Sequence, residues 1–336
     1  MPVTIKDVAA RCKMSVSTIS KAFNGYGDIS AETKEMIHRV ADEMGYFPNA
    51  SARALKTNRS YNLGVVFTED MKNGLTHNFF AALLNAFKFE AEKSGYDVTF
   101  INHNIGGSGM SFLEHCRYRN VDGVCITCAN FYSSEVVKLV SGELPCVTVD
   151  HVFSGRNSVV SDNVSGMSQL VHYAYGLGHR RVAYIHGQQC AVTENRMLGF
   201  HRAAAELNLQ TSERYIMESV YDNAEAGYDA VLKMMDQPEP PTCIFMPDDQ
   251  SAIGALKALN EHGISCPGDV SLAGYDGTKF AGLVTPRLTT VRQDTDTMGR
   301  KAAGLLIREV EDRSFRAGMP EIVPVTLVEG ESIAKI

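Results

Sequence analysis

The chain has 336 residues but no tryptophan, and no apolar run reaches the roughly 18 residues of a membrane span. Its start, "MPVTIKDVAARCK", lacks the apolar core of a secretory signal, so we expect a cytoplasmic protein. The eight cysteines are scattered, apart from Cys125 and Cys128. In a cytoplasmic chain such cysteines are expected to be reduced thiols. Together these features favour a globular protein without disulfides.

Several enzyme motifs are also missing. No G-x-G-x-x-G opens a helix after the first expected strand, and the chain has no G-x-S-x-G and no H-E-x-x-H. The segment "GGSG" (106–109) is expected to be a loop between a strand and a helix. Cys125 and Cys128 resemble half a zinc site, but they lie in an expected buried strand without a second pair nearby, which favours core packing. We therefore predict no catalytic residues, no metal site and no cofactor.

The net charge of −7 excludes a uniformly basic nucleic-acid binder, but the charge is unevenly distributed. Residues 1–60 contain nine of the 32 basic and six of the 39 acidic residues, a net charge of +3. The other 23 basic and 33 acidic residues give the remainder a net charge of −10. A basic head on an acidic body indicates that a polyanion binds at one end.

The first 47 residues have the pattern of a helix-turn-helix. Thr4 and Ser15 are suitable N-caps for two short helices, and Ser30 for a third. Ile19 and Ala22 fall on the apolar side of the second helix, residues 16–23. We therefore predict an all-α DNA-binding head over residues 1–47.

The second helix leaves Val16, Ser17, Ser20 and Lys21 on its outer face. Short hydroxyl side chains and one cation suit base edges and phosphates in the major groove of DNA. A solvated surface helix would have a similar composition, so this face alone does not separate the two interpretations.

A second short segment, 48–60, follows the head. Pro48 favours the end of the third helix, and Asn49 can cap a new one. Small residues alternate with Arg53, Leu55 and Lys56, so two such helices can approach closely and Leu55 can wedge between base steps in the minor groove. The alternative is a flexible linker, because so short a helix is marginal by itself.

From residue 61 the pattern changes to alternating strands and helices. Four buried strands are expected at 63–67, 97–101, 122–127 and 146–149, and four more at 181–187, 215–219, 243–246 and 270–276. We predict an α/β body of two doubly wound parallel-sheet lobes, with a ligand crevice at the carboxyl ends of the strands.

Charged residues gather just after these strands. They are Asp150, Asp162, Arg196, Asp248, Asp249 and Asp276. Ionised groups make strong, directional hydrogen bonds, and several carboxylates with one guanidinium match the hydroxyl groups of a sugar. For any single aspartate a helix cap is the simpler interpretation, but the whole set favours a binding site.

At this point the sequence resembles the lactose/galactose-repressor (LacI/GalR) family over nearly its whole length. The motifs, in order, are "VTIKDVAARCKMSVSTISKAFN", "ISAETKEMI", "EMGYFPNASARALKT", "LGVVF", "NRMLGF", "MPDDQSAIGAL" and "VSLAGYDG". By this resemblance Val16, Ser17 and Lys21 read bases, and Leu55 is the minor-groove wedge, with Ala52 and Arg53 beside it. Arg196, Asp249 and Asp276 match effector contacts, Asp248 replaces a frequent asparagine, and Phe79 is similar to a pocket-lining residue.

The resemblance implies a body like that of periplasmic binding proteins, with three crossovers between its lobes. The expected N-lobe spans about 61–161 and 291–320, and the C-lobe about 162–290 and 321–336. The predicted DNA-binding residues are Thr4, Ser15, Val16, Ser17, Thr18, Ser20, Lys21, Asn24, Asn49, Ala52, Arg53, Leu55 and Lys56.

We predict a transcriptional repressor that binds a palindromic double-stranded DNA operator as a homodimer. A small effector, a sugar, binds between the lobes and acts by allostery. The alternative effector is a purine or nucleoside. The alternative class is a solute-binding receptor or a sugar-acting enzyme on the same body, for which a basic head would have no use.

Overall fold

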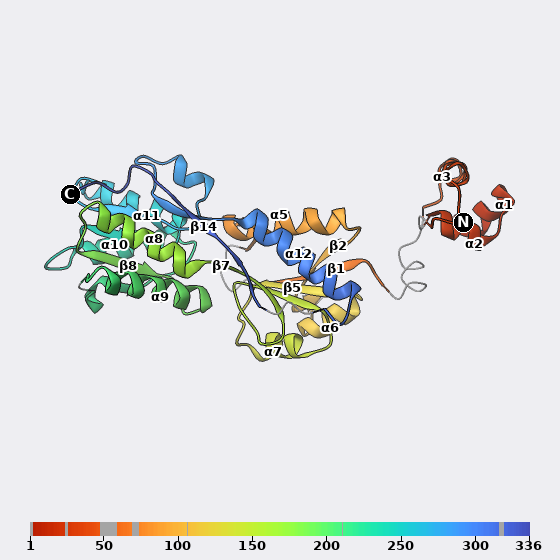
Figure 1. Ribbon diagram of the computed structural model, residues 1–336, viewed down its shortest axis with the longest axis horizontal. Helices are drawn as coiled ribbons and strands as arrows, with labels where there is room; N and C mark the ends of the chain where they lie inside the picture. Colours follow the sequence, from red (N-terminus) through yellow and green to blue (C-terminus); the bar gives the residue numbers. More distant parts are fainter. Residues whose placement is uncertain are drawn as a thin grey trace. The chain divides into compact units, whose positions relative to one another are not determined.

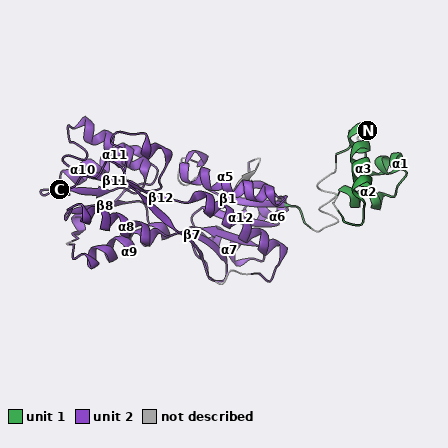
Figure 2. Ribbon diagram, turned by 45° about the horizontal axis from the view of Figure 1, so that its top comes forward, with its two compact units in different colours: residues 1–61 green, residues 62–336 purple. Residues whose placement is uncertain are grey.

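The structure is a computed structural model that describes residues 3–23, 26–47, 59–68, 74–105, 107–209, 211–315 and 319–336. It divides into two compact units, Met1–Tyr61 and Asn62–Ile336, which Figure 2 colours separately. Within the described residues, no helix is both long and apolar enough to cross a membrane.

The described residues of the first unit form three helices, α1 (Ile5–Cys12), α2 (Val16–Phe23) and α3 (Ala31–Met44). Their apolar stripes meet in a small core in which Val8, Ile19 and Ile37 are fully buried. The predicted caps are present. Ser15 Oγ accepts a hydrogen bond from the Thr18 amide at 3.0 Å, and Ser30 Oγ accepts one from the Thr33 amide at 3.2 Å.

The second unit contains two lobes, and the N-lobe is built on a six-stranded parallel sheet of order β13-β7-β6-β5-β1-β2. Its strands are β1 (Asn62–Phe67), β2 (Asp97–Ile101), β5 (Gly123–Cys128), β6 (Cys146–Val149), β7 (Asn157–Ser161) and β13 (Glu321–Val323). The sequence predicts a loop over 106–109. In the structure part of this segment belongs to a small hairpin, in which β3 (Asn104–Ile105) pairs antiparallel with β4 (Ser108–Gly109).

Helices cover both faces of this sheet. One face is covered by α5 (Asn78–Lys93), which follows the short 3-10 helix η2 (Gly74–Thr76), and by α12 (Thr295–Glu311); these helices lie side by side (Figure 1). A Cβ at Gly299 would lie 2.3 Å from the Leu83 carbonyl oxygen, so only glycine allows this approach. The other face carries α6 (Phe112–Tyr118) and α7 (Ser134–Ser141).

The C-lobe has a four-stranded parallel sheet of order β11-β10-β8-β9. Its strands are β8 (Val182–His186), β9 (Ile216–Glu218), β10 (Cys243–Phe245) and β11 (Ser271–Ala273). Two helix pairs cover its faces: α8 (Asn163–Gly176) with α9 (Ala191–Glu206), and α10 (Ala224–Met235) with α11 (Asp249–Glu261). Two short 3-10 helices, η3 (Glu213–Tyr215) and η4 (Lys279–Gly282), complete the lobe. These four strands lie within the four segments that the sequence predicts for this lobe, 181–187, 215–219, 243–246 and 270–276.

Three chain segments connect the lobes. The first passes from β7 into α8 at Asp162, and the others carry β12 (Thr290–Gln293) and β14 (Val325–Val328), which pair antiparallel. β13 pairs with β7 and so belongs to the N-lobe sheet. The last crossover therefore follows Val323, slightly later than the approximate boundary at 320 expected from the sequence.

Candidate effector site and nucleic-acid interface

The outer face of α2 carries the polar side chains expected from the sequence. Ile19 and Ala22 are buried, while Val16 is 41% exposed, Ser17 is exposed, and Ser20 and Lys21 are partly exposed. Ser15 and Thr18 share the capping interaction at the start of the helix. Thr4 donates from its amide and its hydroxyl to the Asp7 carboxylate at 2.8 and 2.7 Å, so it caps α1.

Lys21 has a partner within the head. Its ammonium forms a salt bridge with the carboxylate of Asp28, in the loop before α3. The hydrogen bond and the opposite charge raise the pKa of Lys21 and lower that of Asp28. Lys21 is thus held at the surface in its charged form. The other predicted DNA contacts, Asn24, Asn49, Ala52, Arg53, Leu55 and Lys56, lie outside the described residues.

Two connected cavities occupy the crevice between the lobes. The inner cavity has a volume of about 110 Å³ and is lined from the N-lobe by His77, Phe79, Phe80 and Asp150, from the C-lobe by Cys190, Val192, Arg196, Tyr221 and Asp276, and from β12 by Gln293. The outer cavity has a volume of about 610 Å³ and shares Phe80, Asp150, Cys190, Val192 and Tyr221 with the inner one. Both lobes therefore contribute side chains to both cavities.

Arg196 is the only cationic residue of the described chain that lines the inner cavity. Its side chain is 3% exposed, and its Nε donates to Asn163 Oδ1 at 2.8 Å while a terminal nitrogen donates to the Pro247 carbonyl at 2.7 Å. The other terminal nitrogen lies 3.6 Å from Asp276 Oδ1. These contacts fix the guanidinium plane and leave donor hydrogens for a ligand.

Asp150 follows β6 with a φ of +57°, a left-handed conformation that turns its side chain back toward the sheet edge. Its Oδ1 accepts a hydrogen bond from the Ser161 amide at 3.0 Å. Burial raises the pKa of Asp150 to about 6, with Ser161 and Arg196 opposing the rise and Asp276 adding to it. Asp150 is therefore mainly a carboxylate at pH 7.

Asp276 also has a positive φ, of +98°. Gln293 Nε2 donates to its Oδ1 at 2.7 Å. The other polar atom of this amide, Gln293 Oε1, is buried and has no hydrogen-bond partner among the described residues, and the same holds for His77 Nδ1. Buried polar atoms rarely stay unpaired, so both atoms are suited to contact a ligand or water.

The structure brings Phe79, Asp150, Arg196 and Asp276 together at the inner cavity, whereas the other three predicted effector residues form hydrogen bonds with other groups of the protein. Asp162 accepts from the Ser165 amide at 3.0 Å as the N-cap of α8. Asp248 accepts from the Ser251 amide at 2.7 Å as the N-cap of α11. Asp249 accepts from Thr290 Oγ1 and from the Thr278 amide, both at 2.6 Å. Among the described residues that line either cavity, none of these three aspartates is found.

Burial raises the pKa of Asp248 to about 7 and that of Asp249 to about 8, and the nearby Asp276 adds to both shifts. Their proximity to the cavity makes them part of its electrostatic surroundings. His77, Tyr221 and Gln293 are not among the residues predicted above, although all three lie at or just beyond the end of a strand or at the start of a helix.

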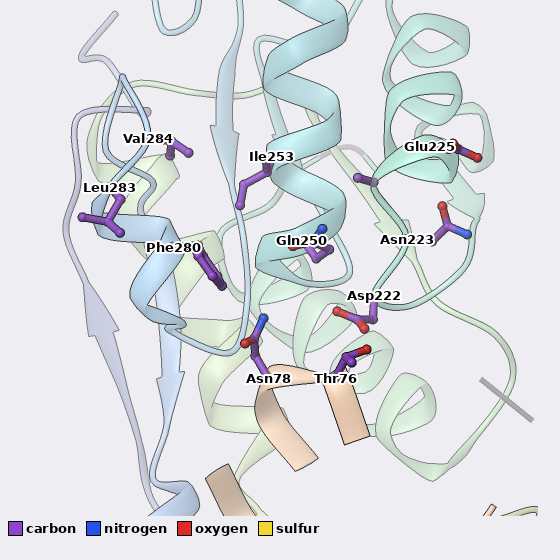
Figure 3. A pocket seen from close by; sticks show the side chains of 11 residues that line it. Thr76, Asn78, Asp222, Asn223, Glu225, Gln250, Ile253, Phe280, Leu283 and Val284 are labelled. Carbon is purple, nitrogen blue, oxygen red and sulfur yellow. The ribbon is translucent and has the colours of Figure 1, made fainter. Parts of the chain in front are cut away.

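A third cavity, of about 810 Å³, lies on the α10, α11 and η4 side of the second unit. Figure 3 shows Thr76 and Asn78, from the N-lobe, facing Phe280, Gln250 and Asp222, from the C-lobe. Phe280 is 49% exposed and Leu283 is 77% exposed. Its apolar lining is concentrated at and just after η4, and Ile253 of α11 adds to it.

Two family models match the chain. Residues 4–49 match the model of bacterial regulatory proteins of the lacI family, and residues 171–333 match that of the periplasmic binding protein-like domain. The HTH-type transcriptional repressor PurR of Pectobacterium carotovorum is 30% identical over 98% of this chain and 97% of its own length. PurR of Escherichia coli is also 30% identical, over 98% of this chain and 97% of its own length.

Solved structures share the fold. The lac repressor dimer bound to operator and the anti-inducer ONPF has a TM-score of 0.83 at 24% identity, covering 99% of this chain and 100% of that one. A complex of the regulator CelR with cellobiose has a TM-score of 0.71 at 24% identity, covering 98% and 99%. The PurR proteins and the lac repressor are repressors, and CelR is a transcriptional regulator. The chain therefore belongs to the lacI family of bacterial regulatory proteins, as a DNA-binding transcriptional regulator.

Proposed function

We propose that this regulator is a repressor that binds a palindromic operator as a homodimer and responds to a small sugar in the crevice between its lobes. The observation that carries the effector half is the arrangement of Asp150 and Asp276 beside the buried guanidinium of Arg196, all lining the inner cavity. The two carboxylates can accept hydrogen bonds from the hydroxyl groups of a sugar ring, and the guanidinium can donate several hydrogen bonds to their oxygens.

The alternative effector is a purine or nucleoside. Its planar base would need an open aromatic face beside the charged groups, and in the inner cavity Phe79 and Phe80 instead meet edge to face, with centroids 5.1 Å apart and planes at 78°. The unpaired Gln293 Oε1 and the Asp150 carboxylate are acceptors. Acceptors gathered in this way suit the many O–H donors of a sugar better than the few N–H donors of a base.

The head supplies the DNA-binding half of the proposal. The hydroxyl groups and Lys21 on α2 suit the major groove. A dimer would place two such helices on the two halves of a palindrome. The exposed apolar side chains of Phe280 and Leu283 support self-association through the surface at η4.

The three crossovers support coupling between the two sites. An effector that contacts both lobes would change the angle between them, because the lobes are connected only through narrow segments such as β12 and β14. This change would reach the head through residue 62, where β1 begins. The expected hinge segment, 48–60, would then order or loosen.

Two measurements test the proposal. A thermal-shift screen of sugars, purine bases and nucleosides should raise the melting temperature of the intact protein only with sugars. Fluorescence anisotropy on an operator obtained by selection from random DNA should show binding by the intact protein and none by residues 62–336. Stabilisation by purines alone would reject the sugar, and operator binding by the headless body would reject the DNA-binding role of the head.

A further inference from the structure

The outer cavity is much larger than the inner one and has a different chemical character. Its volume of about 610 Å³ falls in the range of roughly 300–1,000 Å³ that is typical of small-molecule sites, whereas the 110 Å³ of the inner cavity lies below that range. The inner cavity contains the charged groups Asp150, Arg196 and Asp276. Of these only Asp150 also reaches the outer cavity.

The N-lobe wall of the outer cavity is aromatic. The rings of Phe131 and His151 are stacked with centroids 4.5 Å apart and planes at 4°. Phe153 packs on His151 at 4.7 Å, and Tyr132 meets the same ring edge-on at 5.5 Å. Burial lowers the pKa of His151, which favours the neutral form of its imidazole. The wall is thus a preformed, uncharged aromatic surface.

Tyr221 stands between the two cavities and is held in place. Its hydroxyl bonds with Thr193 Oγ1 at 2.8 Å, and its amide donates to Gln188 Oε1 at 3.1 Å. A Cβ at Gly187 would lie 2.0 Å from the ring, so only glycine leaves room for it. The fixed ring divides the crevice into a charged chamber and an aromatic chamber without separating them.

We propose that the effector has two linked rings, a sugar ring whose hydroxyl groups reach the charged side chains of the inner cavity and a second ring with an apolar face against the Phe131–His151 wall. The second ring is either another sugar or an aromatic aglycone, since both present C–H or π surface to an aromatic side chain. Asn130, Gln188 and Gln189 line the same chamber and can bond with polar groups on its edge. This inference rests on the proposed sugar effector and adds its size and form.

The test compares one-ring and two-ring probes by isothermal titration calorimetry on the intact protein. The probes are glucose, galactose and ribose, their methyl and phenyl β-glycosides, and disaccharides with these sugars at the non-reducing end. For the sugar that binds, we expect a phenyl glycoside or a disaccharide to bind about 10-fold more tightly than the methyl glycoside. The probe with the larger gain in affinity over the methyl glycoside, the phenyl glycoside or the disaccharide, identifies the second ring as aromatic or as a sugar.

Substitutions in the wall locate the effect. Phe131→Ala and Tyr132→Ala should lower this 10-fold preference to about 3-fold or less while leaving the affinity for the methyl glycoside unchanged. Tyr132 is 66% exposed, so its replacement does not endanger folding. Tyr118→Ala, on α6, is the matched control, since Tyr118 is 65% exposed and lines neither cavity.

Equal affinity for one-ring and two-ring probes would overturn the inference and leave the sugar proposal intact. So would an equal loss for both kinds of probe in Phe131→Ala and Tyr132→Ala. If no sugar probe binds, the proposed function fails and the inference fails with it.

Discussion

The guanidinium carbon of Arg196 lies 3.5 Å from the centre of the Tyr275 ring. Tyr275 is completely buried, so the stack fixes Arg196 from inside the C-lobe while the adjacent Asp276 approaches it from the crevice. A guanidinium suits this position better than an ammonium, because its plane stacks on the Tyr275 ring while its nitrogens donate to Asn163 and Pro247.

Arg196→Lys should therefore weaken effector binding at least 10-fold and lower the stability of the body by about 2 kcal/mol. The substitution keeps the charge but loses the bonds to Asn163 and Pro247. Calorimetry and thermal unfolding measure the two effects, with Arg202→Lys, an exposed position on the same helix, as control. Wild-type effector affinity in Arg196→Lys would remove this residue from the site.

Protein stability should fall as the pH rises from about 4 to about 8. Burial holds the pKa of Asp249 at about 8 and that of Asp248 at about 7, above their ordinary value of 3.8. Within this window the native state keeps protons that the unfolded chain has released, so the free energy of unfolding decreases with rising pH.

Asp249→Asn should reduce this pH dependence, because its amide cannot ionise but its oxygen can still accept from the Thr278 amide. The difference in melting temperature between pH 5 and pH 8 should be smaller than in the wild type. Asp229→Asn, at an exposed site on α10, should leave the difference unchanged. An unaltered pH profile in Asp249→Asn would show that Asp249 is ionised in the folded protein throughout this range.

The Lys21–Asp28 salt bridge should compete with DNA. Asp28→Asn removes the partner of Lys21 and a negative charge from the surface of the head. Affinity for operator should rise several-fold at low salt, and the gain should shrink as salt screens the charges. Asp42→Asn, on exposed α3 surface, removes the same charge without freeing Lys21. An equal gain in both variants would mean that net charge alone is responsible.

Leu283→Asp should dissociate the proposed dimer. Leu283 is 77% exposed at η4, and an unpaired carboxylate buried in an interface is costly. Sedimentation velocity should show a monomer at micromolar concentration, with loss of tight operator binding. Val137→Asp, at a 42% exposed site on α7, serves as control. A dimeric Leu283→Asp protein would place the interface elsewhere.

The sequence predicts the fold well because burial dominates the strands. The expected strand at 97–101 matches β2, and that at 146–149 matches β6. The sequence does not predict the β3–β4 hairpin, because strands of two residues have no measurable periodicity. The sequence places β13 beyond the last crossover, because the strand pairs with β7 (Glu321 with Val159, 321 − 159 = 162 residues apart) and such a distant pairing leaves no local signal.

The site is predicted less completely, since the aspartates that follow the strands look alike in sequence. Asp248 caps α11, whereas Asp249, one residue later, turns into the protein toward Thr290. Positive φ angles direct Asp150 and Asp276, and a residue pattern does not encode these angles for aspartate. The aromatic wall is formed by loop residues such as Phe131 and His151, whose meeting depends on tertiary structure.

The crossovers also set the order in which the molecule can be completed during translation. The chain leaves the N-lobe after β7 and returns only with α12 and β13. When residues 62–161 have left the ribosome, one face of their sheet still lacks α12, and the β7 edge lacks β13. Synthesis proceeds at about 5–20 residues per second, so this apolar face stays uncovered for roughly 7–30 seconds while the chain from residue 162 to the end of α12 at Glu311 is made. The lobe that is synthesised first is thus the one that finishes last, and a chaperone would find its binding surface there.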